Sequence, residues 1–202
     1  MSRDQRVYAF GYNGFGQTNP DTRDIIISSP TDITEITGCD KIIWANMNAT
    51  LGEMRDVKGG GGANSWVLWG FDPTPNEITL PKLTELGNIG KCFGDDDGIK
   101  GFLDPDGSIH HIDLNSSQIN VSNFSKKFVD VAQLWTNDDI VGITENGKLL
   151  KWNSGESSSA EEIIMQPKYG MNDYYFTNIA CGENHCLALT HDGEVFSWGS
   201  GR

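Results

Sequence analysis

The sequence predicts an all-β fold made of repeated strand–turn–strand units, and three observations support this. The 202 residues include 24 glycines, above the roughly 7% that is usual. Apolar residues alternate or form short runs between Gly, Asn, Asp and Pro, which is typical of short strands joined by tight turns. Similar units also recur at a spacing near that of one propeller blade. The predicted fold class is a β-propeller with about four blades, forming an incomplete ring.

The last unit is the clearest one. Two predicted strands, 186–190 and 195–198, flank Asp192–Gly193, a hairpin turn of the kind that needs a positive φ. A shift of 46 residues towards the N-terminus gives a second hairpin, in which 140–144 and 148–152 flank the Asn146–Gly147 turn. Both hairpins follow the same strand–turn–strand order.

Earlier units are more diverged. In the third unit, Asp106–Gly107 lies between predicted strands 99–103 and 108–112. In the second unit, a longer insertion lies between predicted strands 49–51 and 66–70. The chain begins with half a unit. The equivalent aromatic or aliphatic positions are Phe10, Trp69, Ile112, Trp152 and Trp198. We predict one partial propeller over residues 1–202, with repeat segments at about 7–17, 42–70, 89–112, 129–153 and 176–202.

Composition and charge exclude several function classes. With 37% hydrophobic and 10% aromatic residues, the chain has enough apolar material for a core. Its formal charge of -13 argues against direct nucleic-acid binding, because such binding relies on Lys and Arg neutralising phosphates.

The expected location is the nucleus and/or the cytoplasm, without a membrane. Residues 1–6 are charged and lack the apolar core of a signal peptide, and the longest aliphatic run is Ile25–Ile27. No C-x-x-C spacing occurs, and an intracellular setting would keep the cysteines reduced. These cysteines are Cys39, Cys92, Cys181 and Cys186.

The segment 180–199 resembles the repeat of the regulator of chromosome condensation family, which reads G-x-x-H-x-L-A-L-T-x-x-G-x-V-x-x-W-G. Residues 11–17 resemble the G-x-N-x-x-G-Q that follows W-G in that family, and the opening looks most like its small single-propeller members of the domain-containing protein 1 type. The resemblance implies a seven-bladed propeller with four-stranded blades. Since seven blades need roughly 300 to 350 residues, we expect an N-terminal fragment.

The resemblance also implies structural roles for a set of repeat positions. These are Gly11, Gly16, Trp69, Gly70, Gly107, Gly147, Trp152, Gly182, His185, Gly193, Trp198 and Gly199. The middle repeats depart from the pattern, since Thr136 and Asp139 stand where the last repeat has Gly182 and His185.

Two histidine motifs invite a metal-site interpretation. His185 lies near Cys181, Cys186 and Asp192, but a zinc site needs four ligands at compatible spacing, so a structural role is favoured. His110–His111 are adjacent on a strand and should point to opposite faces, one to the surface and one to the core.

Three loop motifs are predicted to be turns without a cofactor. Asp95–Asp97 lacks EF-hand spacing, and Gly59–Gly62 lacks the Lys-Ser/Thr of a phosphate-binding loop. The polar loop 154–162 is either contact surface or solvent-facing filler, with filler favoured. No cofactor and no metal are expected.

Trp44 and Trp135 align one residue apart within the unit, near the loop that leads to the next strand. A core position is favoured for both, and the alternative is an aromatic anchor for a binding partner. Together with Asp95, Asp96 and Asp97, they are the candidate partner-binding residues.

The predicted function is a non-enzymatic scaffold that binds a protein partner through propeller loops, because no catalytic set or cofactor fingerprint is present. The resemblance implies partners such as chromatin-associated proteins, a histone-demethylating enzyme or small GTPases. The alternative is a guanine-nucleotide exchange factor for a Ran-like GTPase, whose basic face could meet the acidic surface. Against it, the chain lacks the founding member's basic N-terminal tail and recognisable exchange-loop residues. An inhibitor of a secreted enzyme is a third option, which the absence of a signal peptide disfavours.

Overall fold

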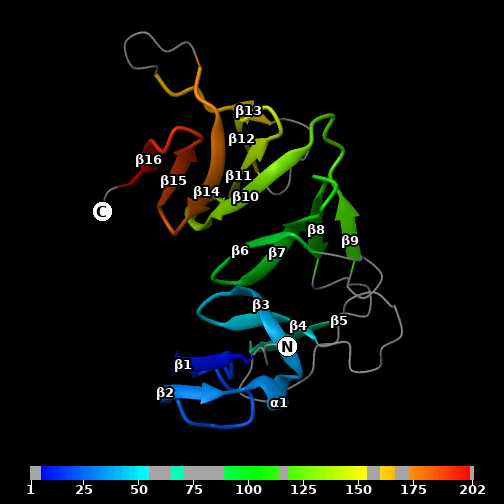
Figure 1. The fold of residues 1–202 in the computed structure, drawn as a ribbon, viewed down its shortest axis with the longest axis vertical. Helices are drawn as coiled ribbons and strands as arrows, with labels where there is room; N and C mark the ends of the chain where they lie inside the picture. The colour runs from blue at the N-terminus through cyan, green and yellow to red at the C-terminus, as the bar shows by residue number, and fades with distance from the viewer. Residues whose placement is uncertain are drawn as a thin grey trace, which may run out of the picture. The chain divides into compact units, whose positions relative to one another are not determined.

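The computed structural model describes residues 6–54, 65–70, 89–113, 118–153, 160–166 and 173–200. Of these residues, 58% lie in strands and 5% in helices, and the strands form five antiparallel sheets (Figure 1). The predicted all-β class is confirmed. The chain divides into two compact units, residues 1–88 with 96–98 and residues 89–95 with 99–202.

The first unit contains two sheets. In one, β1 (Tyr8–Tyr12) pairs with β2 (Ile26–Asp32); in the other, the order is β3 (Cys39–Ala45), β4 (Ala49–Met54) and β5 (Ser65–Gly70). A single helical turn, α1 (Thr34–Thr37), precedes β3 and ends at Gly38, whose φ of 69° is left-handed. The sequence analysis did not anticipate β2 or α1.

A buried cluster in the first unit consists of Val7, Ile33, Cys39 and Trp69, and Leu51, Trp66 and Leu68 are also buried. The indole Nε1 of Trp69 donates a hydrogen bond to the backbone oxygen of Gln17 at 2.9 Å, so this large side chain is buried with its polar atom satisfied.

The second unit contains three sheets. The first is β6 (Lys91–Asp95), β7 (Gly98–Leu103), β8 (Ile109–Asp113) and β9 (Gln118–Val121). The second is β10 (Phe128–Leu134), β11 (Asp139–Thr144), β12 (Leu149–Asn153) and β13 (Glu161–Glu162), with the short helix η2 (Trp135–Asn137) between β10 and β11. The third is β14 (Phe176–Cys181), β15 (His185–Thr190) and β16 (Val195–Gly199).

Glycine conformations confirm the predicted hairpin turns. Gly107, Gly147 and Gly193 have φ values of 77°, 70° and 85°, which an L side chain rarely adopts. At two W-G steps the geometry also repeats, because Gly70 and Gly199 have φ values of 105° and 117°.

In the second unit, a hairpin turn of one sheet is hydrogen-bonded to the first strand of the next sheet. The Phe128 N–H donates to the Gly107 oxygen, and the Phe176 N–H donates to the Gly147 oxygen, both at 2.9 Å. A hairpin glycine of one repeat therefore anchors the first strand of the following repeat.

A buried carboxylate joins the first strands of the three sheets. Asp130 of β10 accepts from Lys91 Nζ of β6 at 2.6 Å and from the Ile179 N–H of β14 at 2.8 Å. The same lysine donates to the Ile179 oxygen at 2.8 Å. This network links β6, β10 and β14 through charge-assisted hydrogen bonds.

Two buried clusters fill the second unit. In one, Trp152 packs against Phe124 and Phe128, with ring centroids 5.0 and 5.2 Å away. The other contains Ala132, Val141, Ile143, Leu149, Phe176, Ile179, Cys186 and Ala188. Within the described part of the chain, no helix is long and apolar enough to cross a membrane.

Candidate partner-binding surface

The turns between the first and second strands carry the candidate binding residues. Trp44 lies near the end of β3, and Trp135 begins η2. Both indoles are half-buried, as is Trp198, whereas Trp66, Trp69 and Trp152 are buried. The core position favoured for most tryptophans therefore holds for three, and Trp44 and Trp135 both retain an accessible part.

The turn that follows Trp135 is held by a neighbouring turn, Gly182–Asn184. The Trp135 N–H donates to the Gly182 oxygen at 3.4 Å, and the Thr136 N–H donates to the Glu183 oxygen at 3.1 Å. The Thr136 hydroxyl donates to Asn184 Oδ1 at 2.5 Å. These bonds fix the backbone of the turn that carries the half-buried indole.

The rest of this turn is polar and acidic. Asp138 ends η2 with a left-handed φ of 54°, and its carboxylate is exposed, as is that of Glu183. From the other side, Asn153 donates to the Asn137 oxygen at 3.1 Å. We define the Trp135 surface as Trp135–Asp138 together with Gly182–Asn184. It combines the half-buried indole of Trp135, carried by a hydrogen-bonded turn, with two exposed acidic residues, Asp138 and Glu183.

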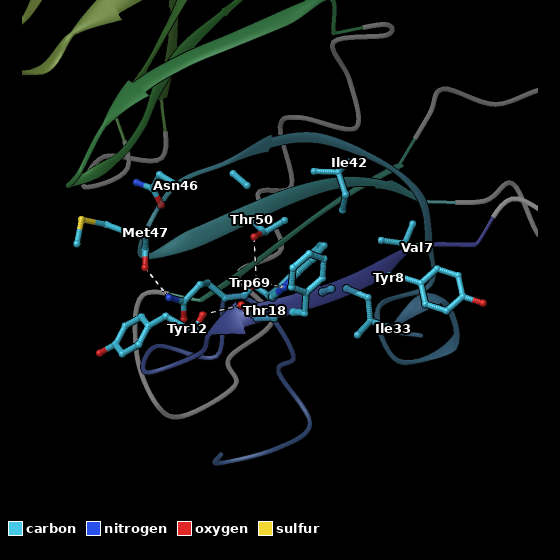
Figure 2. Close-up of a pocket in the computed structure, with 14 residues that line it drawn as sticks. Val7, Tyr8, Tyr12, Thr18, Ile33, Ile42, Asn46, Met47, Thr50 and Trp69 are labelled. Atoms are coloured by element: carbon cyan, nitrogen blue, oxygen red, sulfur yellow. Dashed lines mark hydrogen bonds between the residues drawn. The ribbon is translucent and has the colours of Figure 1, made fainter. Parts of the chain in front are cut away.

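The first unit contains an apolar cavity of about 420 Å³ between β1 and the β3–β4–β5 sheet, shown in Figure 2. Tyr8 and Tyr12 line it from β1, and Ile42, Asn46 and Met47 line it from β3 and the turn after it. This turn is the counterpart of the one that holds Trp135. We call this feature the β1 cavity.

Gln17 organises the floor of the β1 cavity. Its Nε2 donates to the Met47 oxygen at 2.5 Å, while its own backbone oxygen accepts from Thr50 Oγ1 at 2.8 Å and from Trp69 Nε1 at 2.9 Å (Figure 2). Gln17 is the last residue of the G-x-N-x-x-G-Q segment. The motif thus connects the loop after β1 to the adjacent sheet.

An aromatic row on β1 was missed by the sequence analysis. Tyr8, Phe10 and Tyr12 are 56%, 66% and 54% exposed. Their spacing of two residues is the available signal, because alternate residues of a strand share one face. This row gives the first unit an exposed apolar face.

The aspartates of the 95–97 turn have unequal environments. Asp95 is only 3% exposed; its carboxylate lies 3.4 Å from Lys100 Nζ and accepts from Gln133 Nε2 at 3.4 Å. Asp96 and Asp97 are exposed, and one oxygen from each of the three aspartates lies within 4.8 Å of the others. Of the three, Asp96 and Asp97 are the solvent-exposed residues.

The cysteines of the last repeat correct an expectation. Cys181 and Cys186 are directly paired across β14 and β15 and form a disulfide, whereas the sequence analysis expected reduced thiols. His185 is exposed, and its backbone oxygen accepts from the Gly182 N–H at 2.9 Å. Among the described residues, the 95–97 aspartates are the one group of three or more gathered as possible metal ligands, so this region supplies no such set.

The paired histidines contact different aromatic rings. His110 is buried, stacks on Phe102 at 4.6 Å and places Nε2 2.7 Å from Asp104 Oδ2. His111 meets the edge of Phe93 at 5.8 Å and is half-buried, so the expected fully exposed histidine is not found.

Burial lowers the pKa of His111, and the nearby His110 lowers it further. Burial alone would raise the pKa of Asp104, but hydrogen bonds from His110 and the Ser108 N–H bring it below its usual value. Together, these shifts favour a neutral His111 and an ionised Asp104.

Two predicted loops lie wholly or mostly outside the described residues. Gly59–Gly62 is one, and residues 154–159 of the polar loop are the other. The end of that second loop is described, and there the prediction was wrong. Glu161 and Glu162 form β13, which pairs with Lys151 and Leu150 of β12.

Comparison with known proteins identifies the repeat and the fold. The family model "Regulator of chromosome condensation (RCC1) repeat" matches residues 176–202. The guanine nucleotide exchange factor SRM1 of Saccharomyces cerevisiae is 30% identical over 117 residues, which are 53% of this chain and 22% of the relative. Human E3 ubiquitin-protein ligase HERC2 is 36% identical over 66 residues, covering 30% of this chain and 1% of the relative.

A solved structure supports the propeller assignment. The crystal structure of Prp20p from Saccharomyces cerevisiae, described with its binding properties to Gsp1p and histones, has a TM-score of 0.65 and 18% identity. The alignment covers 98% of this chain and 54% of Prp20p, so the chain spans about half of that structure. The predicted β-propeller class is confirmed.

Proposed function

We propose that this chain, whose residues 176–202 match the RCC1 repeat model and whose fold is that of the RCC1-type propellers, is a non-enzymatic module that binds a protein partner. The proposed location is the nucleus and/or the cytoplasm. The observation that carries the proposal is the Trp135 surface. Hydrogen bonds to the next repeat fix the turn that carries this partly accessible indole, so the backbone of the turn loses little conformational freedom on binding.

The charge of this surface indicates the chemistry of the partner. Asp138 and Glu183 flank the indole, and the whole chain carries a formal charge of -13. Complementary charge accelerates association and excludes like-charged partners. We therefore propose a partner with a basic face, either a chromatin-associated protein or a small GTPase. Prp20p was described with its binding to Gsp1p and histones, which supports both classes.

The available thiols and histidines support a non-catalytic role. Burial raises the pKa of Cys92 to about 12, so this thiol is not a nucleophile near neutral pH. The Asp104–His110 pair is buried against Phe102, away from the Trp135 surface. Neither group combines an accessible nucleophile with a base, and the proposal requires no cofactor.

Binding of purified yeast core histones and of Gsp1p, measured by calorimetry, tests the proposal. Trp135→Ala should weaken the complex about tenfold or more, because aromatic anchors dominate binding energies. Ile164→Ala removes another exposed apolar side chain, at 81% exposure, and should leave affinity unchanged. If the histones or Gsp1p bind the unaltered chain and bind Trp135→Ala with the same affinity, the Trp135 surface is not the binding site. If neither the histones nor Gsp1p binds the unaltered chain, both proposed partner classes are wrong.

Charge variants test the electrostatic part separately. Asp138→Asn combined with Glu183→Gln should slow association and flatten its dependence on salt, with a smaller effect on dissociation. A changed dissociation rate with unchanged association would instead indicate direct, desolvated contacts at these carboxylates.

Guanine-nucleotide exchange is the second candidate function. The observation that favours it is the 30% identity with SRM1, which is named an exchange factor. Release of a fluorescent guanine nucleotide from Gsp1p should then accelerate at catalytic amounts of the chain. Faster nucleotide release would contradict the proposal of a scaffold without exchange activity. An unchanged release rate together with measurable binding of Gsp1p would support it.

A further inference from the structure

The disulfide of the last repeat closes the turn that holds the Trp135 surface in place. Cys181 ends β14, Cys186 lies in β15, and their directly paired positions enclose residues 182–185. Cys186 is fully buried in the core cluster, whereas Cys181 is half-buried at the edge of the turn. Of the two residues, Cys181 is therefore the more accessible.

The enclosed turn accepts hydrogen bonds from two other segments. Its Gly182 and Glu183 oxygens accept from the N–H groups of Trp135 and Thr136. Its Asn184 oxygen accepts from the Ser200 N–H at 2.7 Å, just after β16. The position of the Trp135 turn thus depends on the conformation that the disulfide constrains.

We infer that the Cys181–Cys186 pair is a reversible redox-modification site that controls the rigidity of the Trp135 surface. When oxidised, the cross-link holds residues 182–184 in the conformation that Trp135 and Thr136 bind. When reduced, the turn gains conformational freedom, because a closed loop of a few residues becomes an open one. This inference concerns the conformation of the turn and does not depend on the proposed function.

The exchange chemistry follows from the greater exposure of Cys181 compared with Cys186. A thiolate of a small dithiol attacks Sγ of Cys181, the S–S bond breaks, and Cys186 leaves as a thiolate that takes a proton. The second thiol of the reagent then attacks the mixed disulfide, releasing Cys181 as a thiol. Two electrons pass to the protein, and the dithiol becomes a cyclic disulfide. In the nucleus or cytoplasm, where glutathione keeps most thiols reduced, glutathione disulfide would re-form the cross-link by the reverse exchange and would itself be reduced to two molecules of glutathione.

The other two cysteines are not equivalent to this pair. Cys39 is fully buried, with its sulfur 3.0 Å from Thr37 Oγ1. Cys92 is buried, and burial raises its pKa to about 12. Both thiols are buried, and that of Cys92 is not readily ionised, so redox reagents should act first on the 181–186 pair.

Hydrogen exchange of the full chain in glutathione buffers tests the inference. Reduction should speed exchange at the Trp135 and Thr136 amides by about tenfold or more, because their acceptors become mobile. The Gly107 amide, which donates to the Asp104 oxygen at 3.0 Å in another hairpin, should not change. Reoxidation should restore the slow exchange.

Matched variants separate this effect from general instability. Cys181→Ala with Cys186→Ala should exchange fast at Trp135 under both conditions, while Cys92→Ala should keep the full redox response. Since the redox comparison on the unaltered chain needs no variant, misfolding of the double variant would not remove the test. Three results would each overturn the inference. They are labelling of all four thiols in the oxidised chain, resistance of the disulfide to millimolar glutathione, and equal hydrogen exchange at the Trp135 and Thr136 amides in both redox states.

Discussion

The sheets β10 to β16 and the sheets β1 to β5 differ in the kind of apolar side chain that they expose. On β1, Tyr8, Phe10 and Tyr12 are 56%, 66% and 54% exposed. Among the described residues of β10 to β16, the exposed large apolar side chains are aliphatic, namely Val129, Leu187, Leu189 and Val195. The diverged first unit therefore presents an exposed aromatic face.

The largest expected effect is the loss of a repeat tryptophan. Trp152→Ala should lower the free energy of unfolding by about 3–5 kcal/mol, because a buried ring is replaced by a cavity. Trp44→Ala, at a half-buried site of the first unit, should cost clearly less. Chemical denaturation of both variants checks this, and equal losses would remove the contrast between the units.

Equivalent glycines give the next largest contrast. Gly11 and Gly199 have φ values of 116° and 117°, so alanine is strained at both. A Cβ at Gly199 would lie 2.6 Å from the His185 Cα, whereas nothing lies within 4 Å of one at Gly11. Gly199→Ala should cost about 3 kcal/mol and Gly11→Ala about 1 kcal/mol of unfolding free energy. Thermal unfolding would contradict this if Gly11→Ala were the more harmful change.

The ion pairs should also differ between the units. Asp130→Asn weakens a buried network and should cost about 2 kcal/mol, as for hydrogen bonds to charged groups. Lys41→Met removes an exposed pair with Glu53, whose atoms lie 3.5 Å apart, and should cost less than about 1 kcal/mol. High salt should reduce the second effect more than the first, which denaturant titrations at two ionic strengths can measure.

The smallest expected effect is a pH dependence from His111. Its folded pKa lies below 6.5, so the unfolded chain binds this proton more readily, and stability should decline as pH falls below 6.5. His111→Phe should reduce this decline, whereas His191→Asn, at an exposed site, should not. Asp104, with a lowered pKa, should add a further loss below about pH 3.8. An unchanged pH profile of His111→Phe would show that burial does not perturb this histidine.

The hairpins of the second unit could be predicted because Gly107, Gly147 and Gly193 mark turns that need a positive φ. The short outer strands β9 and β13 could not be predicted from the sequence. Neither β9 nor β13 contains a repeated residue pattern, and β13 has only two residues, whose pairing with β12 depends on the sheet already present.

The binding surface was predictable only in part. Trp135 was a candidate from its place in the repeat, but its fixation by residues 182–184 depends on contacts between segments 47 to 48 residues apart. The disulfide was missed because the spacing of Cys181 and Cys186 matches no cysteine motif. Only the register of β14 with β15 brings the two sulfurs together.

The most direct test of the central claim is a hydrogen-exchange footprint of the chain bound to core histones or to Gsp1p. If the Trp135 surface binds the partner, the amides of residues 135–138 and 182–184 should exchange more slowly in the complex, with little change at the β7–β8 hairpin. Protection confined to the β1 cavity, with unchanged exchange at residues 135–138, would contradict the account.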